Sequence, residues 1–258
     1  MAKRKKANPT TPQLQTYYHV SQRPAQALLF LLPLVIAYEL TMALSAYSGD
    51  HTDIIARRLL NLAFQKLGAT GFFLPGILVV VVLLSMHVIS RDKFQWRPRT
   101  YAVMWLESLV LALPILAFGI VFPVKAAAAV SGPDFTPLAG VFDKGPWLRQ
   151  MAFSVGAGIY EELVFRLFGI AILHALLIDL LVLPRHVGEL VAIGVTAMLF
   201  SIYHFKPENP YELRKFIFYL LAGVYFACIY VYRGFGIVAG CHAMYDVIVS
   251  TLAATQRE

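Results

Sequence analysis

Long apolar stretches dominate the chain, and short polar segments separate them. Because roughly twenty consecutive apolar residues cross a bilayer, the pattern predicts membrane spans at about 25–47, 71–89, 101–122, 147–178, 190–205, 216–232 and 237–254. The fourth apolar run continues to Pro184, so it fits either one long helix or two spans broken near Gly169. We therefore expect an all-α fold, a polytopic transmembrane helical bundle with seven or eight spans.

Composition supports a membrane protein. The chain is 59% hydrophobic and 14% charged, whereas soluble domains carry about 25% charged residues. A membrane β-barrel would show short segments of alternating polarity, and the sequence lacks them. The net charge is +7, and the positively charged residues lie mostly in the segments between the apolar runs. They therefore indicate the orientation of the spans rather than a nucleic-acid partner. The two cysteines, Cys228 and Cys241, lie in or beside predicted spans and imply no disulfide framework.

The segments between the spans predict how the chain is oriented. Residues 1–24 form a polar, basic tail that we expect to be disordered, without a cleaved signal peptide. Residues 49–68 fit an amphipathic surface helix or an ordinary loop helix. The basic segment 91–99 should be cytoplasmic, and the Gly- and Pro-containing segment 123–146 should be an exterior loop. We expect an integral protein of the cell (inner) membrane with a cytoplasmic N-terminus.

Three ionisable residues, Glu161, Glu162 and Arg166, interrupt the fourth apolar run. One Asp, Lys or Arg at the centre of a membrane helix costs roughly 2.5–3.5 kcal/mol, so such residues must pair, line a cavity or take part in chemistry. Glu162 and Arg166 are four positions apart and can form an ion pair on one helix face. Glu161 points about 100° away from Glu162. It has no local partner and is the better candidate for a general base. In the first span, Glu39 either faces the bundle interior or reaches water.

Further polar residues lie in or near later spans. His204 follows the fifth apolar run, and His242 and Asp246 share one face of the last span. A lone histidine at a helix end is more often a packed core or interfacial residue. Gly236 and Gly240 have the small-xxx-small spacing that lets a neighbouring helix approach closely. Burying so many polar groups costs several kcal/mol if they do not meet, which favours one shared site.

The candidate chemistry is hydrolysis without a protein nucleophile, since no serine or cysteine lies at a recognisable motif. A glutamate and a histidine can hold and deprotonate a water molecule, while a second histidine with Asp246 can donate to a developing oxyanion. The same groups could instead bind a divalent metal such as zinc, with Glu161, His204 and His242 as ligands. A His-Glu-x-x-His motif is absent, so we favour a site without a metal or other cofactor.

Three motifs in this order resemble the CPBP family, also called the Abi or type II CAAX prenyl endopeptidase family. They read Glu161-Glu162-Leu163-Val164-Phe165-Arg166, Phe200-Ser201-Ile202-Tyr203-His204 and His242-Ala243-Met244-Tyr245-Asp246. The resemblance implies that residues 147–254 are a CPBP-like catalytic transmembrane core. Residues 25–146, with three spans, are then a variable N-terminal transmembrane part.

The resemblance implies an intramembrane endopeptidase that hydrolyses a peptide bond of a membrane-associated or prenylated substrate, at a site open to the cytosol. It assigns water activation to Glu161 and His204, an oxyanion site to His242 and Asp246, and support to Glu162 and Arg166. Asp246 stands where prenyl-protein proteases have asparagine. Because an ionised aspartate cannot donate a hydrogen bond, Asp246 could orient a protonated His242 instead.

Other interpretations remain open at this stage. The family has been described both as metalloproteases and as metal-free glutamic proteases, and we favour the glutamic type. The chain could also be a catalytically inactive membrane scaffold. A proton- or cation-coupled transporter could use Glu161, Glu162 and Asp246 as its path, although the sequence shows no inverted repeat. The expected partners are the lipid bilayer and a peptide or prenylated protein, with no nucleic acid. The sequence indicates neither the substrate nor the oligomeric state.

Overall fold

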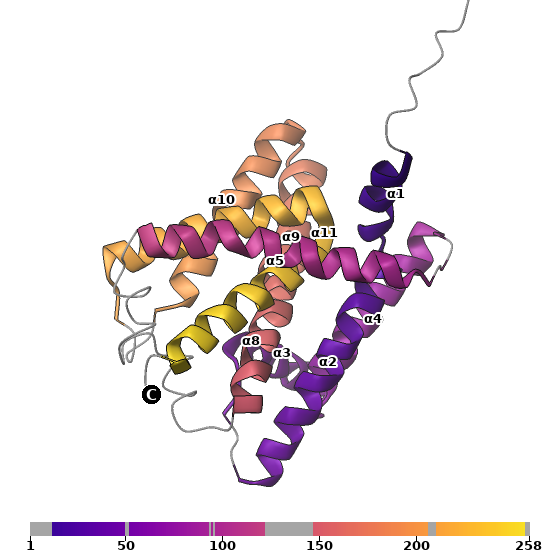
Figure 1. Ribbon diagram of the computed structural model, residues 1–258. Coiled ribbons are helices and arrows are strands. Elements are labelled where there is room, and N and C mark those ends of the chain that lie inside the picture. The colour runs from indigo at the N-terminus through magenta and orange to yellow at the C-terminus, as the bar shows by residue number, and fades with distance from the viewer. Residues whose placement is uncertain are drawn as a thin grey trace, which may run out of the picture.

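The computed structural model describes residues 12–49, 52–92, 94, 96–121, 147–205 and 210–255, and these contain helices and turns but no strand (Figure 1). The predicted all-α class is confirmed. In chain order the helices are α1 (Pro12–Ser21), α2 (Pro24–Tyr47), α3 (Ile55–Lys66), α4 (Leu74–Ser90), α5 (Pro98–Val121), α8 (Trp147–Glu162), η1 (Leu163–Phe168), α9 (Gly169–His174), η2 (Ala175–Leu180), α10 (Arg185–Tyr203) and α11 (Leu213–Thr255).

Five helices within the described residues are long and apolar enough to cross a membrane. They are Pro24–Tyr47, Pro98–Gly119, Arg149–Leu180, Arg185–Tyr203 and Leu213–Ala253. A helical membrane protein is thus confirmed, but the predicted count of seven or eight spans is not. The difference has two sources. The α4 helix has only 17 residues, about 25 Å at 1.5 Å per residue, and α11 runs through two of the predicted spans.

Two glycines decide where the long helices break. Gly234 has φ 79° and ψ 177°, a conformation that glycine adopts far more readily than other residues. It kinks α11 between the predicted spans 216–232 and 237–254. Gly169 instead has helical angles, φ −59° and ψ −51°. The chain from Trp147 to Leu180 is therefore one continuous helix, with π-helical turns at η1 and η2, and the alternative of a break near Gly169 is wrong.

The N-terminal tail is not wholly irregular, because residues 12–21 form α1 where a disordered tail is expected. The Tyr18 hydroxyl donates a hydrogen bond to the Tyr232 carbonyl at 2.7 Å, and the Tyr17 hydroxyl donates to Glu107 at 2.5 Å. These two tyrosines tie α1 to α11 and α5, and this explains its order. Residues 1–11 and the predicted exterior loop at 123–146 lie outside the described residues.

The predicted helix within 49–68 is present as α3, but one of its charged residues is not on the surface. Arg57 is only 1% exposed. Its Nη2 lies 2.8 Å from Glu39 Oε2 on α2, and its Nη1 pairs with Asp53. Burial alone would lower the pKa of Arg57, but hydrogen bonds and charge from Glu39 and Asp53 outweigh it and raise the pKa. Glu39 therefore faces the bundle interior, and the ion pairs anchor α3 to α2.

Close helix contacts bring α8 and α11 together at the centre of the bundle (Figure 1). A Cβ atom added to Gly158 would lie 2.5 Å from the Ala243 backbone nitrogen and 2.8 Å from the Ala239 carbonyl oxygen. Gly236 and Gly240 do permit a close approach, but they face α2 and α5 rather than α8. Small residues on different faces of α11 thus let three helices pack against it.

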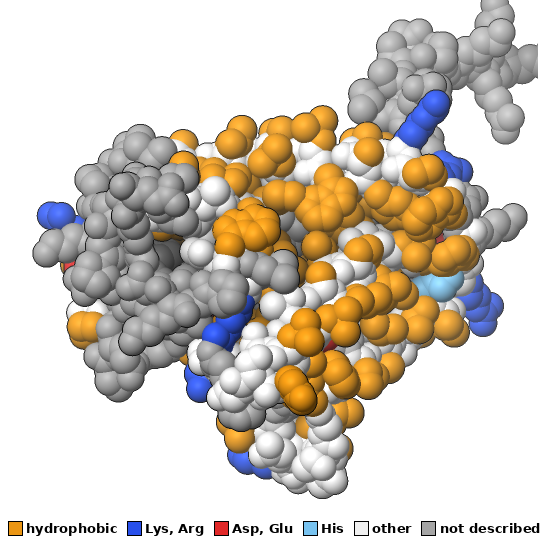
Figure 2. All heavy atoms as spheres, turned by 60° about the horizontal axis from the view of Figure 1, so that its bottom comes forward, with side chains coloured by type: hydrophobic (Ala, Val, Ile, Leu, Met, Phe, Trp, Pro, Cys, Tyr) orange, Lys and Arg blue, Asp and Glu red, His pale blue; other side chains and the backbone are white. Residues whose placement is uncertain are grey.

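Apolar side chains also cover the outside of the bundle. Leu40, Ile77 and Leu106 are each more than half exposed although they lie on α2, α4 and α5. Figure 2 shows hydrophobic side chains over most of the described part of one face, with Lys and Arg mainly toward its margins. Exposed apolar surface of this extent is typical of helices that face lipid.

Candidate active site

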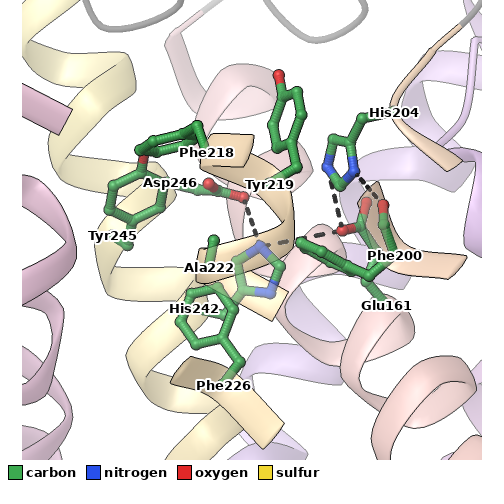
Figure 3. A pocket seen from close by; sticks show the side chains of 10 residues that line it. All are labelled: Glu161, Phe200, His204, Phe218, Tyr219, Ala222, Phe226, His242, Tyr245 and Asp246. Atoms are coloured by element: carbon green, nitrogen blue, oxygen red, sulfur yellow. Dashed lines mark hydrogen bonds and ion pairs between the residues drawn. The ribbon is translucent and has the colours of Figure 1, made fainter. Parts of the chain in front are cut away.

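A small cavity lies among α8, α10 and α11, and its walls come from both polar and aromatic residues. Its volume is about 30 Å³, and roughly 10–15 Å³ is enough for one water molecule. Ten side chains line it (Figure 3): Glu161, Phe200, His204, Phe218, Tyr219, Ala222, Phe226, His242, Tyr245 and Asp246. The cavity therefore has room for water beside ionisable groups in the bundle interior.

Glu161 is the carboxylate at the centre of this cavity, and it is only 4% exposed. Its Oε2 lies 3.9 Å from His204 Nε2 and 3.9 Å from His242 Nε2 (Figure 3). Its Oε1 accepts a hydrogen bond from the Tyr203 hydroxyl at 3.2 Å. The two histidine distances are too long for direct hydrogen bonds, but they suit a bridging water molecule.

His204 follows α10 directly, and its ring is fixed on two sides. Its Nδ1 lies 2.7 Å from the Phe200 carbonyl oxygen, one helical turn earlier. A carbonyl oxygen only accepts, so Nδ1 carries the hydrogen and Nε2 of the neutral ring presents its lone pair to the cavity. The ring also stacks on Tyr219, with ring centres 4.1 Å apart. His204 is thus placed to accept a hydrogen bond beside Glu161.

His242 is oriented by a carboxylate behind the cavity. Its Nδ1 lies 2.7 Å from Glu162 Oε1, which places the hydrogen on Nδ1 and turns Nε2 toward the cavity. There Nε2 lies 3.6 Å from Asp246 Oδ2 (Figure 3). The Phe226 ring stacks on the imidazole, with ring centres 4.5 Å apart. His242 thus stands among the carboxylates of Glu161, Glu162 and Asp246.

The predicted pair of Glu162 and Arg166 forms behind the cavity. Arg166 Nε lies 3.1 Å from Glu162 Oε2, and both side chains are fully buried. Arg166 also donates from Nη2 to the Gly223 carbonyl at 3.2 Å, and its guanidinium lies 4.3 Å from the centre of the Phe200 ring. The pair sets opposite charges against each other in the interior, although Arg166 Nη1 has no hydrogen-bond partner among the described residues, and the contacts of Arg166 connect η1 to α10 and α11.

All six residues singled out from the sequence lie together. Four line the cavity, and Glu162 and Arg166 stand behind His242. Sequence reasoning missed the hydrogen bond between Glu162 and His242, because it joins two helices far apart in the chain. It also missed the hydrogen bond from Tyr203 to Glu161. Tyr203 falls inside the second motif, so its position beside His204 was the available signal.

The site can also be tested for its fit to a metal ion. Zinc held at 2.0–2.1 Å by tetrahedral N and O ligands places those ligand atoms about 3.3 Å apart. Glu161 Oε2 lies 3.9 Å from the Nε2 atom of each histidine. Across the described residues, no three His, Cys, Asp or Glu side chains are arranged as a metal site. At these separations the three ligand atoms do not form a tetrahedral zinc site.

The two ends of α2 are joined to different parts of the fold. Next to its N-terminal end, Arg23 pairs with Asp92 at 3.5 Å, and Gln22 donates to the Tyr232 carbonyl. Beyond its C-terminal end, the Ala56 N–H donates to the Tyr203 hydroxyl beside the site. The α2 helix thus links the N-terminal tail to the neighbourhood of the site.

Comparison with known proteins identifies the segment that carries this site. Residues 143–248, less than half of the chain, match the family model described as type II CAAX prenyl endopeptidase Rce1-like. All three motifs lie within that range. No curated protein and no solved structure matches the chain. The segment that carries the site, residues 143–248, is thus the part of the chain that matches the type II CAAX prenyl endopeptidase Rce1-like family.

Proposed function

We propose that this membrane protein is an intramembrane endopeptidase whose nucleophile is a water molecule held between Glu161 and His204. Family membership supports protease chemistry. The observation that carries the water mechanism is the convergence of Glu161 Oε2, His204 Nε2 and His242 Nε2 on one small cavity. A water molecule between atoms 3.9 Å apart can hydrogen-bond to both.

In the proposed reaction, Glu161 Oε2 accepts a proton from the water as the water oxygen attacks the carbonyl carbon of the scissile peptide. His204 Nε2 accepts the water's other hydrogen bond and so directs the oxygen lone pair at that carbon. The carbonyl oxygen becomes the oxyanion of a tetrahedral intermediate. Protonated Glu161 then gives its proton to the leaving nitrogen, the C–N bond breaks, and an acid and an amine are released.

His242 is the proposed oxyanion donor. With protons on both nitrogens, it donates from Nε2 to the oxyanion while Nδ1 stays bonded to Glu162. Asp246, 3.6 Å from Nε2, cannot donate when ionised, so we propose that it orients and balances the protonated ring. The mechanism is of the glutamic type and needs no metal or other cofactor.

The proposed substrate is a membrane-associated peptide or a prenylated protein. Phe218, Ala222 and Phe226 give the cavity apolar walls, and the family description names prenyl endopeptidases. A cavity of about 30 Å³ holds water but no peptide, so the helices must part when substrate binds. We propose residues 147–254 as the catalytic core, after a basic tail at 1–24 and a variable part at 25–146.

We also propose seven membrane crossings in the cell (inner) membrane. They are α2, α4, α5, the continuous helix from α8 to η2, α10, and the two halves of α11 on either side of Gly234. The basic segment 91–99 favours a cytoplasmic N-terminus.

The test is peptide cleavage by the purified protein in lipid nanodiscs, with a fluorogenic peptide library and a farnesylated peptide as substrates. Glu161→Ala and His204→Ala should each lower the rate by about 10²-fold or more. Glu189→Ala and His186→Ala alter the same residue types at accessible positions of α10 and should leave the rate unchanged. Thermal melting confirms that each variant is folded. Cleavage that survives both site substitutions refutes the mechanism. A wild type that cleaves nothing favours an inactive scaffold or a transporter.

A further inference from the structure

The first turn of α3 reaches the site through one backbone group. The Ala56 N–H donates to the Tyr203 hydroxyl oxygen at 2.9 Å. Ala56 is the second residue of α3, and the first four N–H groups of a helix have no partner within the helix. Because a backbone N–H only donates, Tyr203 must accept this hydrogen bond.

That constraint fixes the direction of the next hydrogen bond. With its oxygen accepting from Ala56, the Tyr203 hydroxyl has one proton left to donate, and Glu161 Oε1 lies 3.2 Å away. The Tyr203 ring packs edge-on against Phe165, with ring centres 5.1 Å apart. The chain of donors therefore runs from the N-terminus of α3 through a packed tyrosine to the proposed base.

The donor end of this chain is itself anchored. Arg57 follows Ala56 directly and is buried against Glu39, Asp53 and the Phe72 carbonyl. This anchor keeps the first turn of α3 in place, so the Ala56 N–H stays aimed at Tyr203. The Ala56 N–H and the Tyr203 hydroxyl are therefore in place before any substrate binds, so the hydrogen bond to Glu161 is preorganised.

We infer that Tyr203 is the positioning residue of the base, because its hydroxyl occupies Glu161 Oε1 and leaves Oε2 as the oxygen that meets the water. This inference rests on the proposed function. Without the hydroxyl, the carboxylate can rotate and present either oxygen, so fewer molecules hold the reactive geometry. The consequence is a slower chemical step with unchanged substrate binding.

The test compares Tyr203→Phe with Tyr225→Phe, a control whose hydroxyl donates to the Leu111 carbonyl outside the cavity. In the cleavage assay, Tyr203→Phe should lower kcat about tenfold or more, the usual effect of losing a hydrogen bond to a charged group, with KM unchanged. Replacing Tyr203 with p-aminophenylalanine, which keeps an N–H donor, should restore most of kcat. A loss confined to KM, or no loss, overturns the inference.

A second measurement does not depend on cleavage. The apolar reagent dicyclohexylcarbodiimide reacts with protonated carboxyl groups, and mass spectrometry locates the labelled residue. The Tyr203 hydrogen bond favours the ionised form of Glu161, so Tyr203→Phe should increase labelling of Glu161 severalfold, and Tyr225→Phe should not. If Glu161 is labelled equally in Tyr203→Phe and Tyr225→Phe, the hydrogen bond from Tyr203 to Glu161 is refuted. If cleavage survives Glu161→Ala while labelling responds as expected, the proposed mechanism fails and the Tyr203 contact stands.

Discussion

Glu162 is expected to matter more for stability than any other carboxylate at the site. Glu162 and Arg166 are fully buried and lie 3.1 Å apart, and Glu162 also accepts the hydrogen bond from His242 Nδ1 at 2.7 Å. In Glu162→Ala, Arg166 keeps the Gly223 carbonyl and the Phe200 ring as neighbours but loses its counter-charge. Removing one partner of a buried pair costs about 3–5 kcal/mol.

That loss is large compared with the whole stability of a protein, which is typically about 5–15 kcal/mol. For a chain of this size, each kcal/mol lowers Tm by about 2–4 °C. Glu162→Ala should therefore melt about 6–20 °C below the wild type. The assay is thermal unfolding of the detergent-purified protein followed by intrinsic fluorescence, with size-exclusion chromatography to detect aggregates.

Two comparisons separate the loss of the ion pair from general damage. The double variant Glu162→Leu with Arg166→Met removes both charges, so it should melt above Glu162→Ala even though it carries two substitutions. Glu189→Ala removes the carboxylate of an equally spaced pair with Arg185 at the helix surface and should not change Tm. The reasoning is refuted if Glu162→Ala has the same Tm as the wild type, or if the double variant has a lower Tm than Glu162→Ala.

Three other predictions follow from the packing of α8 against α11, from the proposed metal-free mechanism and from the proposed membrane orientation. Gly158→Val should abolish cleavage and lower Tm, because its side chain would separate α8 from Ala243; Gly194→Val, where a Cβ meets nothing within 4 Å, should have a smaller effect in the same two assays. Phenanthroline and EDTA should leave the cleavage rate unchanged, and loss of activity that zinc restores would contradict the glutamic mechanism. In a cysteine-free background, a membrane-impermeant maleimide on intact cells should label Lys66→Cys but not Trp96→Cys; the reverse would contradict a cytoplasmic N-terminus.

Helical periodicity explains which features of the site could be predicted. Glu162 with Arg166, and His242 with Asp246, are four residues apart, and a helix brings such residues together whatever the rest of the fold does. The structure places both pairs within 4 Å. The direction of Glu161, away from Glu162, follows from the same geometry. These features are local, so sequence alone was sufficient for them.

Contacts between helices explain what could not be predicted. The bond between Glu162 and His242 spans 80 residues, and the burial of Arg57 depends on Glu39, 18 residues earlier on another helix. A charged residue in an amphipathic segment normally faces water, so the pattern around Arg57 favoured the surface. Only the packing of α3 against α2 supplies the carboxylates that make its burial favourable.

The N-terminal part of the chain contributes to the site as well as supporting it. The family match begins at residue 143, yet Ala56 of α3 bonds to Tyr203, and the Tyr160 hydroxyl, next to Glu161 in the chain, donates to Glu39 of α2. Both contacts join residues outside the matched segment to neighbours of the proposed base. Replacing residues 25–146 with another set of spans would therefore remove the donor that holds Tyr203, even with every motif residue intact. In the proposed mechanism the motifs supply the reacting groups, and residues 25–146 set how well Glu161 is aimed.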